Sequence, residues 1–304
     1  MENNKSFAWP QGILFAFLAL CSSLTIGFII PINLIGFQAE TKQTIKNIND
    51  IEVKVGTQQR LKKFKPAMLT SWQQEAKAKG FSYTLPTRFQ GTIIRKAKLA
   101  PNKKVIALTF DDGPWPGYTA QVLEILRENN IKATFFVVGK YLKNNPELGK
   151  RIVVEGHVIG NHSWHHWYHY FNQKAAAFEI DNTSDLIYQV TGVKTTLFRP
   201  PGGMLHNGLA AYARGKNYAV VMWSADSADY SRPSASVLTN RVLQQSKPGG
   251  IVLMHDGGGN RSHTVAALPL IISKLRNQGY SFVTVPELLE MQYKDQKLIA
   301  NTNQ

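Results

Sequence analysis

The ten residues VIALTFDDGP, at positions 105–114, decide the fold of this chain. The apolar run from Val105 to Phe110 is rich in β-branched and aromatic side chains, and it predicts a strand. Asp111-Asp112-Gly113-Pro114 follows at once and has the composition of a turn. An apolar strand that ends in two carboxylates predicts a sheet whose carboxyl edge carries polar groups.

The same alternation continues along the chain, because a helical pattern separates each apolar run from the next. Strands that alternate with helices favour parallel pairing, and seven such units suit a (β/α) barrel or a doubly wound α/β sheet. The sequence shows no internal repeat and no glycine-rich phosphate-binding loop. The further strands expected are 133–138, 157–161, 195–199, 218–224, 250–255 and 280–285. The helices expected are 119–130, 146–155, 175–191, 207–217, 234–246 and 264–278.

The composition excludes several classes of protein. The chain has 304 residues, 43% of them hydrophobic and 18% charged, which excludes a disordered or fibrous chain. Its single cysteine, Cys21, excludes an intramolecular disulfide framework and a cysteine-based zinc finger. The net charge of +15 favours an anionic neighbour such as a membrane surface, a cell-wall polymer or nucleic acid. A soluble enzyme with a basic surface fits the same count.

The N-terminal region indicates a membrane anchor. No charged residue occurs from Ser6 to Ala39, and the apolar segment 12–37 exceeds the roughly 20 residues that cross a membrane. Its signal-cleavage site is poor, so we expect an uncleaved transmembrane helix rather than a cleaved signal peptide. The expected organisation is an anchor over 1–38, a basic stem over 39–100, an extracytoplasmic α/β domain in the cell envelope over 101–290, and a polar, frayed tail over 291–304.

Ionisable residues and glycine turns gather where the predicted strands end. In a barrel of parallel strands these ends lie at one face, where catalytic groups cluster. Five strands carry such groups, so we expect one composite site. The segments are 109–114 (TFDDGP), 160–166 (GNHSWHH), 199–203 (RPPGG), 224–230 (SADSADY) and 253–256 (LMHD).

The histidines and the aspartate pair predict a metal centre. His162 and His166 are four residues apart, so one helical turn would place them on the same face. Two imidazoles and a carboxylate form a known catalytic zinc arrangement, although imidazole also binds iron, nickel and cobalt. Adjacent side chains of an extended segment point to opposite sides, so Asp111 and Asp112 can divide proton transfer and metal binding. An ordinary turn and a solvated histidine loop explain the same residues when each motif is considered alone.

The segments TFDDG, at 109–113, and HSWHH, at 162–166, resemble the first two motifs of the NodB-type polysaccharide deacetylases, carbohydrate esterase family four. The later segments resemble the other three motifs in the same order, and the resemblance covers roughly residues 100–290. It implies a distorted (β/α)7-8 barrel. It also implies a hydrolase that removes N-acetyl groups from an N-acetylglucosamine polysaccharide, such as peptidoglycan, exopolysaccharide or a chitin-like polymer.

The resemblance implies roles for the first motifs. Asp112, His162 and His166 match the ligands of one divalent metal ion; we expect Zn²⁺, with Co²⁺ or Mn²⁺ as alternatives. Asp111 matches the general base, which takes a proton from the attacking water. Arg199 matches the arginine that orients this base.

The later motifs supply the acid and the substrate contacts. The resemblance implies that His255 is the general acid, that Asp229 is its carboxylate partner, and that Asp226 is the first acid of the same motif. A backbone N–H near Pro201 and Gly202 would hold the oxyanion. The residues expected to contact substrate are Pro201, Gly202, Tyr230 and Leu253, the last two around the acetyl methyl group.

Two departures from the family pattern bear on specificity. Tyr230 stands where the family commonly has tryptophan, and Gly202 stands where it has an aromatic residue. The oxyanion contact is a main-chain one, so glycine at 202 leaves it intact. It removes a side chain that would otherwise shape the substrate groove.

Three other functions compete with N-deacetylation. The same machinery serves an O-acetyl esterase, and the same fold serves a catalytically inactive carbohydrate-binding protein. The third, a membrane-tethered nucleic-acid binder, would need a basic strip with interleaved aromatic residues or a known module. The basic residues of 60–79 provide a cluster but no such module. We therefore expect the acetylated polysaccharide and the membrane as partners and no nucleic acid; nothing in the sequence defines an oligomeric state.

Overall fold

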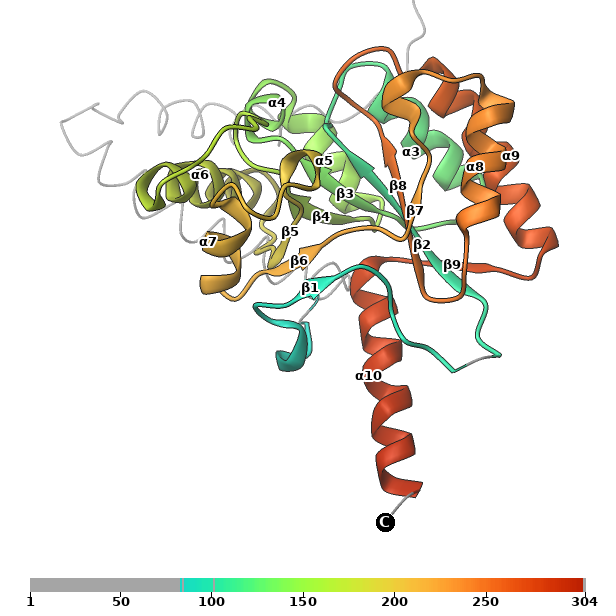
Figure 1. Cartoon of the computed structure of the whole chain (residues 1–304). Helices are drawn as coiled ribbons and strands as arrows, with labels where there is room; N and C mark the ends of the chain where they lie inside the picture. Colours follow the sequence, from blue (N-terminus) through green and yellow to red (C-terminus); the bar gives the residue numbers. More distant parts are fainter. Residues whose placement is uncertain (1–82, 84, 101, 303–304) are drawn as a thin grey trace, which may run out of the picture. The chain divides into compact units, whose positions relative to one another are not determined.

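The computed structural model describes residues 83, 85–100 and 102–302. The predicted membrane anchor, residues 1–38, and the greater part of the predicted stem lie outside the described residues. Within the described part, no helix has both the length and the apolar character that a membrane span requires. These residues form an α/β domain around one parallel sheet (Figure 1).

The strand predicted from the VIALTF run is the centre of this sheet. It is β2 (Val105–Asp111), and all seven of its residues are buried because β3 and β8 flank it and side chains pack on both faces. The strand order is β1-β6-β5-β4-β3-β2-β8-β7, and β9 pairs with the start of β2. The other strands are β1 (Ile93–Ile94), β3 (Thr134–Val137), β4 (Val158–Asn161), β5 (Leu197–Phe198), β6 (Ala219–Val221), β7 (Ala225–Asp226), β8 (Gly250–His255) and β9 (Ser281–Val283).

The expected parallel pairing is confirmed, and the expected barrel is confirmed in part. Each predicted strand is present, and all the strand pairs are parallel. Among the described residues the hydrogen-bonded order begins at β1 and ends at β7, so the sheet is a half-barrel rather than a closed ring. β6 and β7 are short successive pieces of one segment, which pairs first with β5 and then, after residues 222–224, with β8. The chain therefore changes neighbours at the point where a closed barrel would continue one strand.

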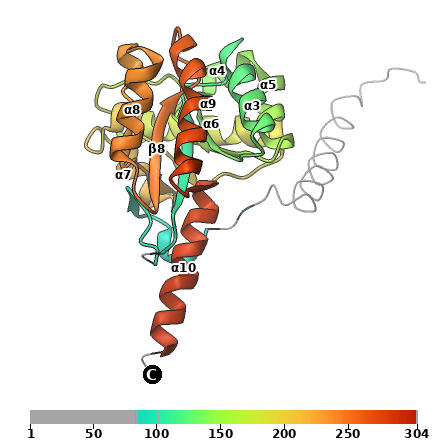
Figure 2. The ribbon, with the colours of Figure 1, turned by 90° about the vertical axis from the view of Figure 1, so that its right-hand side faces the viewer.

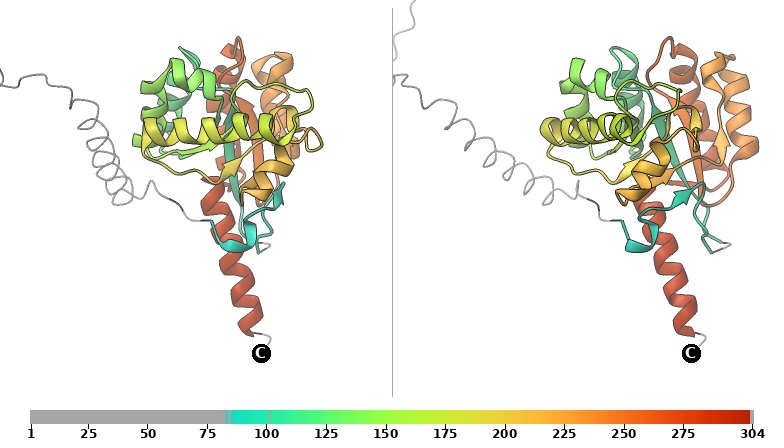
Figure 3. Two further views of the ribbon diagram at one scale, coloured as in Figure 1. Left: turned by 90° about the vertical axis from the view of Figure 1, so that its left-hand side faces the viewer. Right: turned by 60° about the vertical axis from the view of Figure 1, so that its left-hand side comes forward.

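Helices pack in two groups beside the strands. Figure 2 shows α8 and α9 in front of β8, and α3 contacts α9; Figure 3 shows α6 with α7 beside it. The six helices predicted from periodicity are present within a few residues of their expected bounds, and α4 and α10 are additional. The bounds are α3 (Tyr118–Glu128), α4 (Gly139–Asn144), α5 (Pro146–Val154), α6 (Gln173–Thr191), α7 (Leu209–Gly215), α8 (Ala235–Gln245), α9 (Ser262–Asn277) and α10 (Val285–Thr302).

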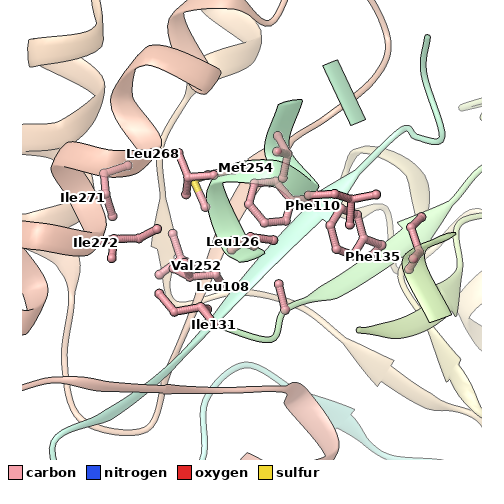
Figure 4. Close-up of a cluster of buried hydrophobic side chains, with 14 of the residues drawn as sticks. Leu108, Phe110, Leu126, Ile131, Phe135, Val252, Met254, Leu268, Ile271 and Ile272 are labelled. Carbon is pink, nitrogen blue, oxygen red and sulfur yellow. The ribbon is translucent and has the colours of Figure 1, made fainter. Parts of the chain in front are cut away.

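The largest hydrophobic cluster joins the central strands to their helices. Leu108 and Phe110 of β2 and Val252 of β8 meet Leu126 of α3 and Leu268 of α9 (Figure 4). These side chains are fully buried, and burial of each aliphatic side chain contributes about 1.5–3 kcal/mol. The core therefore holds β2 and β8 rigidly side by side up to the positions where their polar ends begin.

The expected domain boundaries are wrong at both ends of the domain. Residues 85–100, expected in the stem, belong to the domain: β1 pairs with β6, and Leu85, Phe89 and Ile94 are buried. Residues 291–302, expected in a frayed tail, continue α10. Two side chains of α10 hold it to the chain before β2, because Gln292 accepts a hydrogen bond from the Lys98 N–H and Asp295 accepts one from the Ala100 N–H.

Candidate active site

A pocket of about 640 Å³ lies at the carboxyl ends of the strands. The five polar segments predicted to form a composite site all contribute to its lining. The register explains part of this assembly, because β2 and β8 pair Asp111 with His255 and Thr109 with Leu253. The predicted residues that line the pocket are Asp111, Asp112, His162, His166, Gly202, Asp226, Tyr230, Leu253 and His255.

Arg199 holds Asp111 from behind the pocket. Its guanidinium is fully buried, and Nη1 donates to Asp111 Oδ1 at 2.7 Å and to the Thr109 hydroxyl at 2.8 Å. The remaining nitrogens donate to main-chain oxygens, Nε to Val221 at 3.0 Å and Nη2 to Met222 at 3.2 Å. Every side of the guanidinium is thus occupied, so the carboxylate of Asp111 has a fixed direction.

The cost of burying Arg199 is offset by its surroundings. Burial lowers the pKa of its guanidinium, while the charge of Asp111 and their hydrogen bond oppose that change. The guanidinium also lies over the ring of Phe136, with 4.2 Å from Cζ to the ring centroid. A buried ion pair that loses one partner leaves an uncompensated charge, so these two residues form one unit.

Asp112, His162 and His166 form the predicted metal-binding group. Their ligand atoms all lie within 4.8 Å of one another. His166 Nε2 lies 3.1 Å from Asp112 Oδ1, and His162 Nε2 lies 3.5 Å from the same atom. His162 Nδ1 lies 2.6 Å from the Arg199 carbonyl oxygen, which can only accept, so Nδ1 carries the proton and Nε2 is left for a metal.

The backbone that presents this group is unusual. Asp112, Ser163 and His166 adopt left-handed conformations, with φ of 71°, 67° and 63°. Such conformations cost about 1–3 kcal/mol each in residues other than glycine and cluster at functional sites. Burial opposes ionisation of Asp112, but the neighbouring imidazoles of His162 and His166 hold its pKa well below the usual range. The Asp112 carboxyl is therefore ionised at neutral pH.

His255 and Asp229 form the predicted acid pair. His255 Nδ1 lies 2.6 Å from Asp229 Oδ1, and the His255 N–H donates to Asp229 Oδ2 at 2.8 Å. The Thr264 hydroxyl donates to Oδ2 as well, at 2.8 Å. Burial disfavours the imidazolium, but the hydrogen bond and charge of Asp229 outweigh burial and raise the pKa of His255 to about 9. His255 is therefore protonated at neutral pH.

Three of the four residues predicted to contact substrate line the pocket, namely Gly202, Tyr230 and Leu253. Leu253 is buried in the pocket wall, and the half-exposed Tyr230 ring packs edge-on against His255, with 6.0 Å between centroids. Asp226 lies in the lining and accepts from the Ala228 N–H, whereas Asp229 alone of the two acids contacts His255. Pro201 is a correction: it is buried at the start of the turn, and Pro200 lines the pocket in its place.

Sequence reasoning assigned no role to Asp256 and missed Arg261. Asp256 is fully buried behind the DDGP turn, and it accepts a hydrogen bond from the Thr119 hydroxyl at 2.5 Å. Asp256 lies so close to the turn that a Cβ at Gly113 would lie 2.3 Å from Asp256 Oδ2. Burial raises the pKa of Asp256 to about 7, and the charges of Asp112 and Asp111 add to this. Arg261 donates to the Asp229 carbonyl at 3.3 Å and lies 3.9 Å from Asp112 Oδ2. No pattern in the sequence distinguishes Arg261 from a solvated arginine.

Comparisons with known proteins agree with this geometry. A profile of the polysaccharide deacetylase family matches residues 98–221. A peptidoglycan-N-acetylglucosamine deacetylase of Bacillus cereus is 44% identical over 195 residues, which cover 63% of this chain and 91% of that protein. The solved structure of the Bc1960 peptidoglycan N-acetylglucosamine deacetylase is 35% identical, covers 66% of this chain and 94% of that chain, and has a TM-score of 0.62.

A further solved structure is that of BA3943, a CE4 family pseudoenzyme from Bacillus anthracis. It is 34% identical, covers 66% of this chain and 69% of that chain, and has a TM-score of 0.60. The parallel half-barrel is a fold of the NodB, or CE4, type. The chain belongs to the polysaccharide deacetylase family, and it is a polysaccharide deacetylase, a hydrolase, as the sequence predicted.

Proposed function

We propose that this protein removes N-acetyl groups from N-acetylglucosamine units of a polysaccharide, with peptidoglycan as the first candidate. The observation that carries the proposal is the pairing of Asp111 with His255 across β2 and β8, beside the Asp112, His162 and His166 group. A base and an acid are thereby held at one edge of the sheet. The relatives named above as peptidoglycan N-acetylglucosamine deacetylases support this substrate.

A divalent metal ion fits the group of Asp112, His162 and His166. Asp112 Oδ1 is buried without a hydrogen-bond partner among the described residues, and both histidine Nε2 atoms lie within 3.5 Å of it. Two nitrogen donors and one oxygen donor suit Zn²⁺, with Co²⁺ or Mn²⁺ as alternatives. When bound, such an ion supplies Lewis-acid chemistry, because it polarises a carbonyl oxygen and lowers the pKa of a water molecule.

The side chains around this group divide the proton transfers. Arg199 binds Asp111 Oδ1, and Oδ2 lies 3.6 Å from His162 Nε2, so Oδ2 is placed to accept the proton of the attacking water. His255, charged beside Asp229, is placed to donate a proton to the leaving amine nitrogen. Leu253 and Tyr230 provide an apolar wall for the acetyl methyl group. A main-chain N–H at Gly202 would stabilise the oxyanion, and such a donor is worth about 3–4 kcal/mol.

Acetate release by the purified full-length protein tests the proposal. The protein is freed of metal with a chelator and then supplied with zinc, cobalt or manganese. Its substrates are N-acetylglucosamine oligomers, peptidoglycan and an O-acetylated polysaccharide. We expect metal-dependent acetate from the first two substrates and none from the Asp111→Asn variant, which keeps the shape of the side chain and loses its basicity.

Two results would replace this function with an alternative. Acetate from the O-acetylated polysaccharide alone would establish an esterase. A folded protein that binds the oligomers and releases no acetate with any metal would establish a carbohydrate-binding role, as in a family that includes a pseudoenzyme.

We further propose that the catalytic domain lies on the extracytoplasmic side of the membrane, in the cell envelope. The charge-free segment 12–37 and the peptidoglycan substrates in the relatives' names support this location. Protease added to intact cells whose outer layers have been made permeable would then digest the domain while cytoplasmic proteins survive. Survival of the domain under those conditions would contradict the proposal.

A further inference from the structure

The loop between β4 and α6 carries aromatic side chains on the rim of the pocket. Trp167 and Tyr168, here called the aromatic ledge, both line the pocket and are 48% and 55% exposed. Large rings exposed beside a catalytic pocket indicate a binding surface. We propose that the aromatic ledge binds sugar units that flank the acetylated unit of the polysaccharide, so that the protein favours long chains. This inference rests on the proposed function.

Stacking holds the indole of Trp167 in one orientation. It lies parallel to the imidazole of His165, with 4.0 Å between centroids and 7° between planes. Phe178 of α6 lies on the same imidazole at 5.9 Å and 8°. Trp167 is therefore packed against a group of rings that includes Phe178 of α6, yet about half of its surface stays accessible.

A buried carboxylate fixes the base of this stack. Glu179 of α6 is only 2% exposed, and its Oε2 accepts hydrogen bonds from the N–H groups of Trp164 and His165, both at 2.9 Å. Its Oε1 lies 2.6 Å from His165 Nδ1. A loop held at three atoms by one carboxylate is ordered before a ligand arrives. Such preorganisation lowers the entropy lost on binding.

Tyr168 occupies the space above Gly202. Gly202 has a φ of +58°, and a Cβ built on it would lie 2.8 Å from Tyr168 Cε1. The same ring packs edge-on against His166, with 5.2 Å between centroids. Tyr168 therefore bridges the metal-binding loop and the turn after β5. The space that a side chain at position 202 would fill is occupied by an aromatic ring from a different loop.

The chemistry of the aromatic ledge suits a sugar chain. A pyranose presents C–H groups on its faces and hydroxyl groups at its edges, and aromatic rings with polar tips match both. The phenol of Tyr168 can donate a hydrogen bond to a sugar hydroxyl. Lys140 and Asp226 in the same lining offer further hydrogen bonds.

The test compares substrates of different length. Steady-state rates are measured with N-acetylglucosamine oligomers of two to six units for the full-length protein and for Trp167→Ala, Tyr168→Ala and Tyr168→Phe. We expect each alanine variant to raise KM for the hexamer about tenfold, or about 1.4 kcal/mol, with a smaller effect on the dimer. Tyr168→Phe keeps the ring and should keep most of the affinity.

Tyr293→Ala is the matched control, because Tyr293 is a 38% exposed aromatic residue on α10, at the other end of the sheet. Equal length dependence in the wild type and both alanine variants would overturn the inference. Calorimetric titration with the hexamer separates this result from failure of the proposed function, because it needs no turnover. A loss of affinity in Trp167→Ala but not in Tyr293→Ala supports the aromatic ledge even in an inactive protein; absent or unaltered binding refutes it.

Discussion

Two largely buried histidines at opposite ends of the sheet show how differently the ends are built. His157 precedes β4 at the amino end, where burial and the positive charges of Lys132 and Arg151 lower its pKa to about 3. His255 ends β8 at the carboxyl end, where burial also disfavours the charge but Asp229 raises the pKa to about 9. Both side chains are largely buried, so the neighbouring charges make the difference. They keep one imidazole charged while the other stays neutral.

The contrast extends to the residues around each histidine. The amino end is closed by β1, β9 and α10 around apolar side chains such as Val285, Leu288 and Leu289. The carboxyl end holds buried Arg199, Asp111 and Asp229 instead. The amino end of the sheet stabilises the fold through apolar packing, and the carboxyl end holds the charged side chains of the candidate active site. Substitutions at the two ends should therefore separate activity from stability.

Removal of a ligand at the carboxyl end should have the largest effect on activity. The His166→Ala variant removes one of the three side chains, Asp112, His162 and His166, that could bind the metal ion. We expect acetate release to fall about 10³-fold, or about 4 kcal/mol, because the metal is worth several kcal/mol of transition-state stabilisation. The free energy of unfolding should change by less than about 1 kcal/mol, since the His166 side chain is 20% exposed.

His169→Ala is the control for that measurement. His169 is an exposed histidine of the same loop. Its replacement should leave acetate release and zinc affinity, measured by calorimetric titration, close to wild type. Equal zinc affinity in His166→Ala and His169→Ala would show that the predicted ligand set is wrong.

The Asp229→Asn variant tests what sets the charge of His255. A general acid acts only while protonated, so the wild-type rate should fall as pH rises through about 9. An asparagine amide donates toward Nδ1 and favours the neutral imidazole. The falling limb of the kcat/KM profile should therefore move from about 9 towards the ordinary 6.5, with little change well below that pH. If the alkaline limb of the kcat/KM profile does not move, a titrating group other than His255 causes the fall in rate.

A core substitution at the amino end should have the converse effect. Leu288→Ala removes a fully buried side chain that packs α10 beneath the sheet. We expect the free energy of unfolding, from urea titrations, to fall by about 2–5 kcal/mol. The kcat/KM of the folded fraction should stay within about twofold of wild type. A large loss of kcat/KM at a temperature where the variant is folded would show that the two ends are coupled.

Much of this contrast could be predicted from local sequence. The apolar runs predicted every strand long enough to show a pattern, and the motif residues Asp111, Asp112, His162, His166 and His255 do meet in one pocket. β1 and β7 escaped prediction because each has two residues and lies outside the β-branched and aromatic runs that predicted the other strands, the equally short β5 included. Residues 291–304 were expected to fray because the anchors of α10 are distant in the sequence: Lys98 bonds to Gln292.

The part of the site that escaped prediction depends on contacts between loops. Tyr168 fills the space above Gly202, and the sequence around neither residue predicts this contact. Glu179 offers one usable signal, because a lone acid on the buried face of the helix predicted over 175–191 needs a partner. Pro201 was chosen over Pro200 because the sequence does not show which ring of a Pro-Pro pair faces the pocket.

The smallest effect concerns the pH dependence of stability. The folded pKa of His157 lies near 3, so between about 3 and 6.5 the unfolded chain binds a proton that the folded protein does not. Stability is then complete above the ordinary 6.5 and falls with decreasing pH, by at most about 1.4 kcal/mol per pH unit. His255 has the opposite sign: its contribution is complete below 6.5 and is lost as pH rises through about 9.

A His157→Gln variant isolates the acid side, because its side chain does not titrate while the carboxylates titrate alike in both proteins. Urea titrations at pH 7, 6 and 5 should show a shallower loss of stability in the variant than in the wild type. From pH 7 to 10 the two proteins should lose stability in parallel, since His255 is unchanged. Equal slopes on the acid side would mean that His157 is protonated in the fold, and the amino end would then tolerate a buried charge as the carboxyl end does.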